Sequence, residues 1–172
     1  MRKIMFVGRS ESGKTTIMQA INGKRITYHK TQYVNNFDVI IDTPGEYAET
    51  KQLSGALAVY GCEADIIGLL MSAIEPFSLY PPNVVSVSNR EVVGVVTKCD
   101  HWAANPELAA EWLRLAGCKK IFFTSAYTGE GIAEILSYLK EPVDVLPWEV
   151  AKAEYDKLGF GPGESEKHTL RI

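Results

Sequence analysis

The stretch GRSESGKT, Gly8 to Thr15, follows directly after the apolar run IMFV at Ile4 to Val7. It fits the pattern GxxxxGK[ST], in which a glycine-rich turn joins a strand to a helix. The glycines let backbone N–H groups point toward one centre, and the helix N-terminus adds positive potential. Lys14 can then reach the β- and γ-phosphates of a nucleotide, and the Thr15 hydroxyl can ligate Mg²⁺. We predict a nucleoside triphosphate here; the alternative is a chance glycine turn with a surface lysine.

Short apolar runs rich in β-branched and aromatic residues recur along the chain, and each is typical of a buried parallel strand. They lie at 4–7, 37–41, 64–71, 92–97 and 120–124. Helical patterns separate them, at 14–21, about 52–59, 106–116 and 132–139. This alternation predicts an α/β fold in which helices cover both faces of a mainly parallel sheet. Asn35 and Asn36 tolerate a two-residue turn, so we also expect one antiparallel edge strand.

The chain has 172 residues, of which 46% are hydrophobic, and this predicts one ordinary domain with a single core. Its net charge of −3 indicates no overall affinity for nucleic acid. Residues 1–30, however, carry seven Lys or Arg and one acidic residue. This basic part surrounds the GRSESGKT turn, and it is either a solvated face or a field that attracts phosphate.

No stretch approaches the roughly 18 apolar residues of a membrane span, and the first apolar run is too short for a signal-peptide core. Cys62, Cys99 and Cys118 match neither a metal knuckle nor a disulfide framework. We therefore expect a soluble, cytoplasmic protein with reduced thiols and no membrane partner. Beyond 141 the pattern weakens, and residues 142–172 are predicted to form a C-terminal extension with a short helix from Pro147 and a loose tail.

The sequence DTPG, Asp42 to Gly45, follows the predicted strand at 37–41. A carboxylate there lies at the carboxyl edge of the sheet, where α/β proteins bind ligands. Asp42 is therefore a candidate for the Mg²⁺ shell, and the Gly45 N–H is a candidate for contact with a γ-phosphate. DTPG alone could be an ordinary turn, but beside the GRSESGKT turn it favours the second acid of a nucleoside triphosphatase.

Two further strand ends carry candidate base-binding residues. TKCD, Thr97 to Asp100, closes one strand, and TSA, Thr124 to Ala126, closes the next. In the order GxxxxGKT, DTPG, TKCD, TSA, the chain resembles the small Ras-like GTPases. The Asp100 carboxylate can accept from both N1–H and the exocyclic amine of guanine, whereas adenine has an acceptor at N1. Sites of this kind reject the wrong analogue by about 10⁴-fold, so we predict GTP or GDP, with ATP as the alternative.

This resemblance implies a three-layer α/β/α P-loop NTPase, a Ras-like G domain, over residues 1–141. It places Lys98 along the base and ribose and the Ala126 N–H near the guanine carbonyl oxygen. The residues expected to bind nucleotide are Gly8, Arg9, Ser10, Glu11, Ser12, Gly13, Lys14, Thr15, Thr16, Thr97, Lys98, Asp100, Ser125 and Ala126. Those expected to act at the γ-phosphate are Lys14, Thr31, Gly45 and Glu46. Those expected to bind Mg²⁺ are Thr15, Thr31 and Asp42.

The chain departs from ordinary Ras-like proteins at several positions. The segment before Asp42 is short, so Thr27 and Thr31 are the candidates for the Mg²⁺-sensing threonine, and we favour Thr31. Glu46 stands where Ras-like proteins have the glutamine that positions the attacking water. A carboxylate cannot donate to phosphate oxygens, so we expect slow hydrolysis unless Glu46 acts as a base; it could also be a solvated loop charge. Thr97 replaces the more usual Asn, whose amide would brace the GRSESGKT turn, which we call the phosphate loop. We therefore expect modest affinity for the nucleotide.

Four stretches give a closer resemblance. KTQ at 30–32, IDTPGEY at 41–47, CEADII at 62–67 and VVTKCD at 95–100 are similar to the EutP/PduV family. Its members are accessory proteins of bacterial ethanolamine and propanediol utilisation, associated with microcompartments. The resemblance covers residues 1 to about 140. It implies a nucleotide-binding protein with GTPase features and, for the ethanolamine branch, a proposed acetate kinase activity.

Three functions remain open at this stage. The first is a GTP-binding switch with slow hydrolysis, whose state is read by a microcompartment shell protein or enzyme. The second is a phosphotransferase that moves a γ-phosphoryl group onto acetate. The third is a docking module that binds nucleotide for stability and attaches through the helix at 148–158. Arg9 either neutralises phosphate charge in the manner of an arginine finger or points to solvent.

Overall fold

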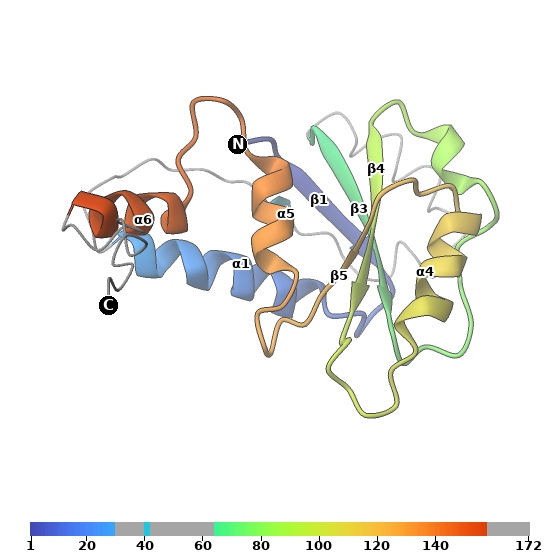
Figure 1. The fold of residues 1–172 in the computed structure, drawn as a ribbon. Helices are drawn as coiled ribbons and strands as arrows, with labels where there is room; N and C mark the ends of the chain where they lie inside the picture. Colours follow the sequence, from blue (N-terminus) through green and yellow to red (C-terminus); the bar gives the residue numbers. More distant parts are fainter. Residues whose placement is uncertain (30–39, 42–63, 158–172) are drawn as a thin grey trace, which may run out of the picture.

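A computed structural model describes the backbone of residues 1–29, 40–41 and 64–157 (Figure 1). Its strands are β1 (Ile4–Gly8), β2 (Ile40–Ile41), β3 (Ile66–Ser72), β4 (Glu91–Thr97) and β5 (Ile121–Phe123). Its helices are α1 (Lys14–His29), the short 3₁₀ helix η1 (Val84–Val87), α4 (Pro106–Leu115), α5 (Ile132–Leu139) and α6 (Pro147–Lys157). Each strand falls on one of the apolar runs that predicted it. A strand covered on both faces of the sheet has no side exposed to solvent, so its sequence is apolar without alternation.

The strands form one sheet in the order β2-β1-β3-β4-β5, and each pair that the structure describes is parallel. From β1 the chain passes to β2 on one side, whereas β3 pairs with β1 on the other. The strand order therefore reverses at β1 and β3, and open α/β sheets bind ligands at the carboxyl ends of such strands. In the register of this pair, Gly8 lies opposite Leu70.

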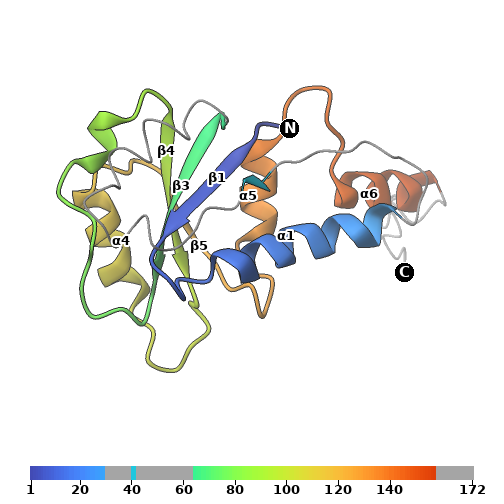
Figure 2. The same ribbon diagram turned by 180° about the vertical axis from the view of Figure 1, so that it is seen from behind.

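Helices cover both faces of the sheet, as Figures 1 and 2 show from opposite sides: α4 lies on one face, and α1 and α5 lie on the other. Alternate residues of β1 divide between the two cores. Met5 and Val7 pack with Leu113 of α4, whereas Ile4 and Phe6 join Ile17 of α1 and the buried face of α5. The predicted three-layer α/β/α architecture is confirmed.

Some local predictions differ from the structure. Helix α1 continues to His29, although Asn22 and Gly23 are weak helix formers. The proline-rich loop after β3 contains the single turn η1. Of the predicted edge hairpin at 31–41, only Ile40–Ile41 is described. The predicted helix near 52–59 and the tail beyond 157 lie outside the described residues.

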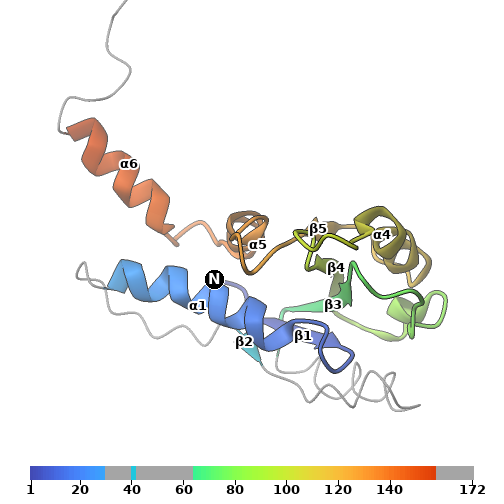
Figure 3. The same cartoon turned by 90° about the horizontal axis from the view of Figure 1, so that it is seen from below.

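The start of the C-terminal extension packs on the α1 and α5 side of the molecule. Leu146 is 3% exposed and belongs to the core on that side, and α6 contacts α1 (Figure 3). Lys140 Nζ lies 2.5 Å from Glu149 Oε1, and the Leu146 amide donates to Glu149 Oε2 at 2.9 Å. These two hydrogen bonds lower the pKa of the Glu149 carboxyl. Within 1–29, 40–41 and 64–157, no helix has the length and apolar character needed to cross a membrane.

Candidate nucleotide-binding site

The GRSESGKT turn joins β1 to α1 at the carboxyl edge of the sheet. Lys14 Nζ donates to Gly8 O at 2.7 Å and to Arg9 O at 2.6 Å, and the side chain is only 8% exposed. The Ser12 amide closes the turn by donating to Arg9 O at 3.2 Å. The loop therefore curls around the lysine and holds its ammonium group close to the backbone from which α1 departs.

Two residues of this loop have left-handed backbone conformations, Glu11 with φ 64° and Gly13 with φ 94°. Such residues turn successive N–H groups toward one side, and this makes an anion-binding concavity. A Cβ at Gly8 would lie 2.9 Å from Leu70 Cβ and 3.0 Å from the backbone oxygen of Leu70, so the loop needs a glycine there. The Ile17 amide donates to Gly13 O at 2.9 Å and begins the hydrogen bonds of α1. The loop thus has the backbone features that a bound phosphate requires.

The phosphate loop is tied to the TKCD loop by Thr97 at the end of β4. Thr97 Oγ1 donates to Ser12 O at 2.6 Å, and both residues are buried. The expectation that Thr97 deprives the phosphate loop of its brace is therefore wrong. The threonine hydroxyl itself makes the connection to the phosphate-loop backbone.

The TKCD and TSA loops are joined to each other through their backbones. The Cys99 amide donates to Thr124 O at 3.2 Å, and Thr124 Oγ1 donates to Val96 O at 2.8 Å. Lys98 has a left-handed conformation with φ 57°, which turns the chain at the strand end. Asp100 is exposed, so its carboxylate is accessible to a base.

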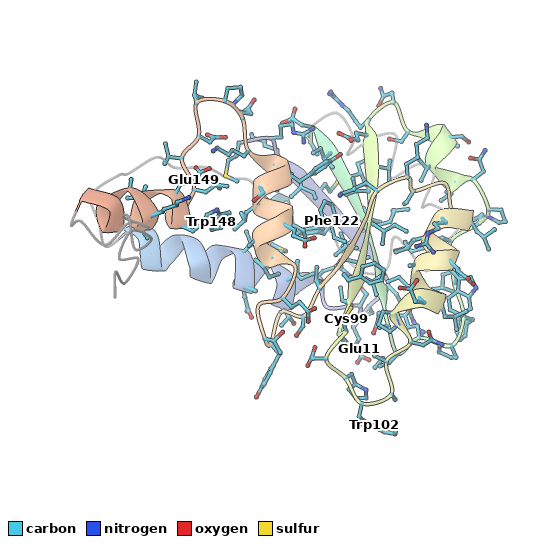
Figure 4. The ribbon with its side chains drawn as sticks, viewed as in Figure 1. Glu11, Cys99, Trp102, Phe122, Trp148 and Glu149 are labelled. Carbon is cyan, nitrogen blue, oxygen red and sulfur yellow. The ribbon has the colours of Figure 1, made fainter. Side chains whose placement is uncertain are left out.

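The TSA loop folds back on itself before α5. The Thr128 amide donates to Ser125 Oγ at 3.1 Å, and the Ser125 amide donates to Glu130 O at 3.1 Å. Ser125 is buried and Ala126 is half-buried. Figure 4 shows Glu11 of the phosphate loop and Cys99 of the TKCD loop at the same end of the sheet. The structure therefore gathers the predicted phosphate-binding and base-binding loops at one edge.

The surroundings of two further residues bear on their predicted behaviour. The Arg9 guanidinium lies over the Phe77 ring, 5.7 Å from its centre, so it has a specific neighbour on the segment after β3. Burial raises the pKa of the Cys99 thiol, against the opposing effect of its hydrogen bond with Thr124. A raised pKa disfavours the reactive thiolate, so Cys99 stays a neutral thiol.

Of the predicted Mg²⁺ ligands, Thr15 is described, and it is exposed in the first turn of α1 beside Thr16. A hydroxyl next to a phosphate-binding concavity suits Mg²⁺, which is held through few protein ligands and substrate phosphates. Thr31, Asp42, Gly45 and Glu46 lie outside the described residues. Within the described ranges, no group of three or more His, Cys, Asp or Glu side chains is placed to hold a metal by itself.

Sequence reasoning missed one residue at this edge, Tyr80. Its phenol donates to Leu70 O at 2.6 Å and lies 3.2 Å from Val7 O, at the carboxyl ends of β3 and β1. The proline-rich context of Tyr80 indicates a loop but gives no sign of where that loop returns. Only the fold brings the ring to the start of the phosphate loop.

The parallel sheet, the phosphate loop after β1 and the two loops that follow β4 and β5 define a P-loop protein with the G-domain fold of GTPases. The FeoB G-domain of Methanococcus jannaschii matches 80% of this chain and 94% of its own, with a TM-score of 0.51 and 17% identity. Translation elongation factor SelB of Methanococcus maripaludis, in its apo form, matches 80% of this chain and 32% of its own, with a TM-score of 0.52 and 17% identity.

Residues 1–141 match the PduV-EutP family, described as "Ethanolamine utilisation - propanediol utilisation". Propanediol utilization protein PduV of Citrobacter freundii is 42% identical over 142 residues, which are 81% of this chain and 93% of that protein. Probable acetate kinase EutP of Escherichia coli K12 is 29% identical over 143 residues, 81% of this chain and 89% of that protein. The chain belongs to the PduV-EutP family, and the resemblance of its motifs is confirmed.

Proposed function

We propose that this chain is a GTP-binding accessory protein of propanediol or ethanolamine utilisation, with slow Mg²⁺-dependent GTP hydrolysis. The observation that carries the proposal is the bond from Thr97 to Ser12 O, which couples the phosphate loop to the loop that carries Asp100. A nucleotide with a guanine base and a polyphosphate tail would contact both loops at once. The chemistry of Asp100 favours guanine over adenine, since the carboxylate can pair with two adjacent N–H donors.

The described residues would act on the phosphates chiefly by positioning and charge. Lys14 would move its donors from the Gly8 and Arg9 carbonyls to phosphate oxygens, and the loop amides would hold the same oxygens. Bound Mg²⁺, held by Thr15 and Asp42 with Thr31 as a sensor, would neutralise charge on the phosphates. Glu46 lacks the amide N–H that a glutamine would donate to a phosphate oxygen, and this supports slow hydrolysis.

A second candidate is transfer of the γ-phosphoryl group to acetate. It is favoured by the relatives at 29% identity that are named probable acetate kinase EutP. An acetate oxygen would form the new P–O bond, the bond to the β-γ bridging oxygen would break, and nucleoside diphosphate would leave. The same loop and lysine would serve either acceptor, because phosphoryl transfer depends mainly on orientation and charge neutralisation.

The relatives support a choice between the two pathways. The identity of 42% to a propanediol utilisation protein, against 29% to the EutP proteins, favours the propanediol branch. We propose a cytoplasmic protein whose nucleotide state is read by a shell protein or enzyme of a bacterial microcompartment.

Calorimetry with GTP and ATP in the presence of Mg²⁺ tests the base preference, with Asp100→Ala as the matched variant. We expect GTP to bind at least about 100-fold tighter than ATP, and Asp100→Ala to remove most of that difference. Equal or tighter binding of ATP would contradict the guanine site. Failure of either nucleotide to bind would refute the proposed function as a whole.

The phosphoryl acceptor is tested with γ-labelled GTP and ATP, with and without acetate. Label in inorganic phosphate alone supports the hydrolase, whereas label in acetyl phosphate supports the kinase. Glu46→Gln belongs in the same assay. We expect slow hydrolysis by the wild type and a faster rate for the variant, whereas a fast wild type slowed by the change would show that Glu46 is catalytic.

A further inference from the structure

Tyr80 is a half-buried titratable side chain that the proposed function leaves without a role. Its hydroxyl donates to Leu70 O at 2.6 Å and also approaches Val7 O at 3.2 Å. Burial raises the pKa of this phenol far above its ordinary value, so the group stays a hydrogen-bond donor. A phenylalanine ring would fill the same space as the tyrosine ring. The role of the hydroxyl group must therefore lie in its contacts with the two carbonyls.

Both carbonyls lie where the phosphate loop begins. Val7 directly precedes Gly8, and Leu70 lies opposite Gly8 in the sheet. A Cβ on Gly8 would lie 3.0 Å from Leu70 O, so this carbonyl packs against the first glycine of the loop. Gly8 O in turn accepts from Lys14 Nζ at 2.7 Å. One short path therefore runs from the Tyr80 hydroxyl, through the ends of β3 and β1, to the lysine of the phosphate loop.

The segment that carries Tyr80 is anchored on the opposite side. The Asn83 amide donates to Leu115 O at 2.8 Å, and the Val85 amide donates to Ala116 O at 3.1 Å, which fixes the segment to the end of α4. Phe77, in the same segment, packs its ring against the guanidinium of Arg9. The segment thus touches the start of the phosphate loop at two points and is itself held by a helix of the core.

We propose that Tyr80 is a positioning residue of the phosphate loop, which holds the ends of β1 and β3 so that Gly8 and Lys14 keep the geometry that receives a diphosphate. This inference rests on the proposed nucleotide site and deepens it. Tyr80 contacts no substrate in this scheme; it acts through Val7, Leu70 and Gly8. The Tyr80 hydroxyl lies where the strand order reverses, between β1 and β3. A small shift of β1 relative to β3 at this point would move the phosphate loop that follows β1.

Tyr80→Phe tests the proposal, with Tyr138→Phe as the matched control. Tyr138 also donates one hydroxyl hydrogen bond, to Glu91 at the start of β4. Tyr138→Phe therefore removes a comparable hydroxyl group at the other end of the sheet. The first readout is amide hydrogen exchange at 8–13 in the nucleotide-free protein. The second is the ratio of GDP to GMP affinity, because GDP adds a β-phosphate for the loop to hold.

We expect Tyr80→Phe to raise exchange at 8–13 about five- to tenfold and to lower the GDP-to-GMP affinity ratio by a similar factor. Tyr138→Phe is expected to change neither. A uniform rise in exchange across the protein, with an unchanged affinity ratio, would overturn the proposal and leave Tyr80 as a packing residue. If the wild type binds no guanine nucleotide, the proposed function fails, and exchange at 8–13 still decides whether Tyr80 holds the loop.

Discussion

Thr97 joins the two halves of the candidate site through one hydroxyl. In Thr97→Val the side chain keeps its shape but cannot donate, so Ser12 O stays buried without this partner. We expect the free energy of unfolding to fall by about 1–3 kcal/mol. GTP affinity should fall about tenfold, since the phosphate loop loses its tie to β4. Urea denaturation and calorimetry measure the two effects.

Thr97→Ser is the control for that change, because serine keeps the hydroxyl and loses only a methyl group. It should retain GTP affinity within about twofold, as a surviving donor requires. Equal losses of affinity in the serine and valine variants would contradict the bracing role. Thr97→Asn asks a separate question, namely whether a longer amide can replace the hydroxyl across the same gap.

At the residue scale, some roles could be predicted from the sequence and others could not. The phosphate loop could be predicted because its glycine spacing and its place between a strand and a helix impose the same backbone wherever they occur. Thr97 could not be interpreted in this way. Whether a hydroxyl reaches Ser12 O depends on how closely the two loops approach each other, and that distance is set by the packing of the whole domain. Tyr80 was missed for the same reason.

At the scale of one element, the start of α5 depends on Gly131. This residue precedes the helix with φ 70°, and a Cβ there would lie 2.0 Å from Phe123 O of β5. The clash is with backbone, which cannot rotate away. We expect Gly131→Ala to lower the free energy of unfolding by more than about 3 kcal/mol and to displace the TSA loop.

Gly117→Ala is the matched comparison, since Gly117 also has a positive φ, of 106°, but its nearest neighbour would be Val85 Cβ at 3.1 Å. That contact needs only a small shift of the segment that carries Val85, so we expect a loss of about 1–2 kcal/mol. Urea denaturation of both variants measures the difference. Similar losses would show that the left-handed conformation alone, and not the contact with β5, sets the cost at Gly131.

Elements with a strong apolar pattern were predictable, and those whose limits depend on neighbours were not. The strands of the sheet follow apolar runs that only a doubly covered sheet can bury. Helix α1 runs beyond its predicted end, and it contacts α6, a segment far away in the chain. The short turn η1 forms where the segment after β3 is fixed to α4.

At the scale of the whole molecule, the candidate site and the C-terminal extension lie at different ends. Figure 4 shows Glu11 and Trp102 at the carboxyl edge of the sheet, whereas Trp148 and Glu149 lie in the first turn of α6. The family match ends at residue 141, before this extension. Helix α6 contacts α1 of its own chain, which weakens the hypothesis of a helix free to dock elsewhere.

The separation predicts that the extension stabilises the domain without tuning the nucleotide site. Leu146 is the buried anchor of the extension, so Leu146→Ala should lower the free energy of unfolding by about 2–5 kcal/mol. GTP affinity should stay within about twofold of wild type, because the cavity forms on the α1 and α5 side, away from the loops. Val143→Ala, at a side chain 88% exposed in the same extension, should change stability by less than about 0.5 kcal/mol. A loss of GTP affinity in Leu146→Ala, measured well below its unfolding transition, would instead show that α1 transmits the state of the extension to Lys14 at its other end.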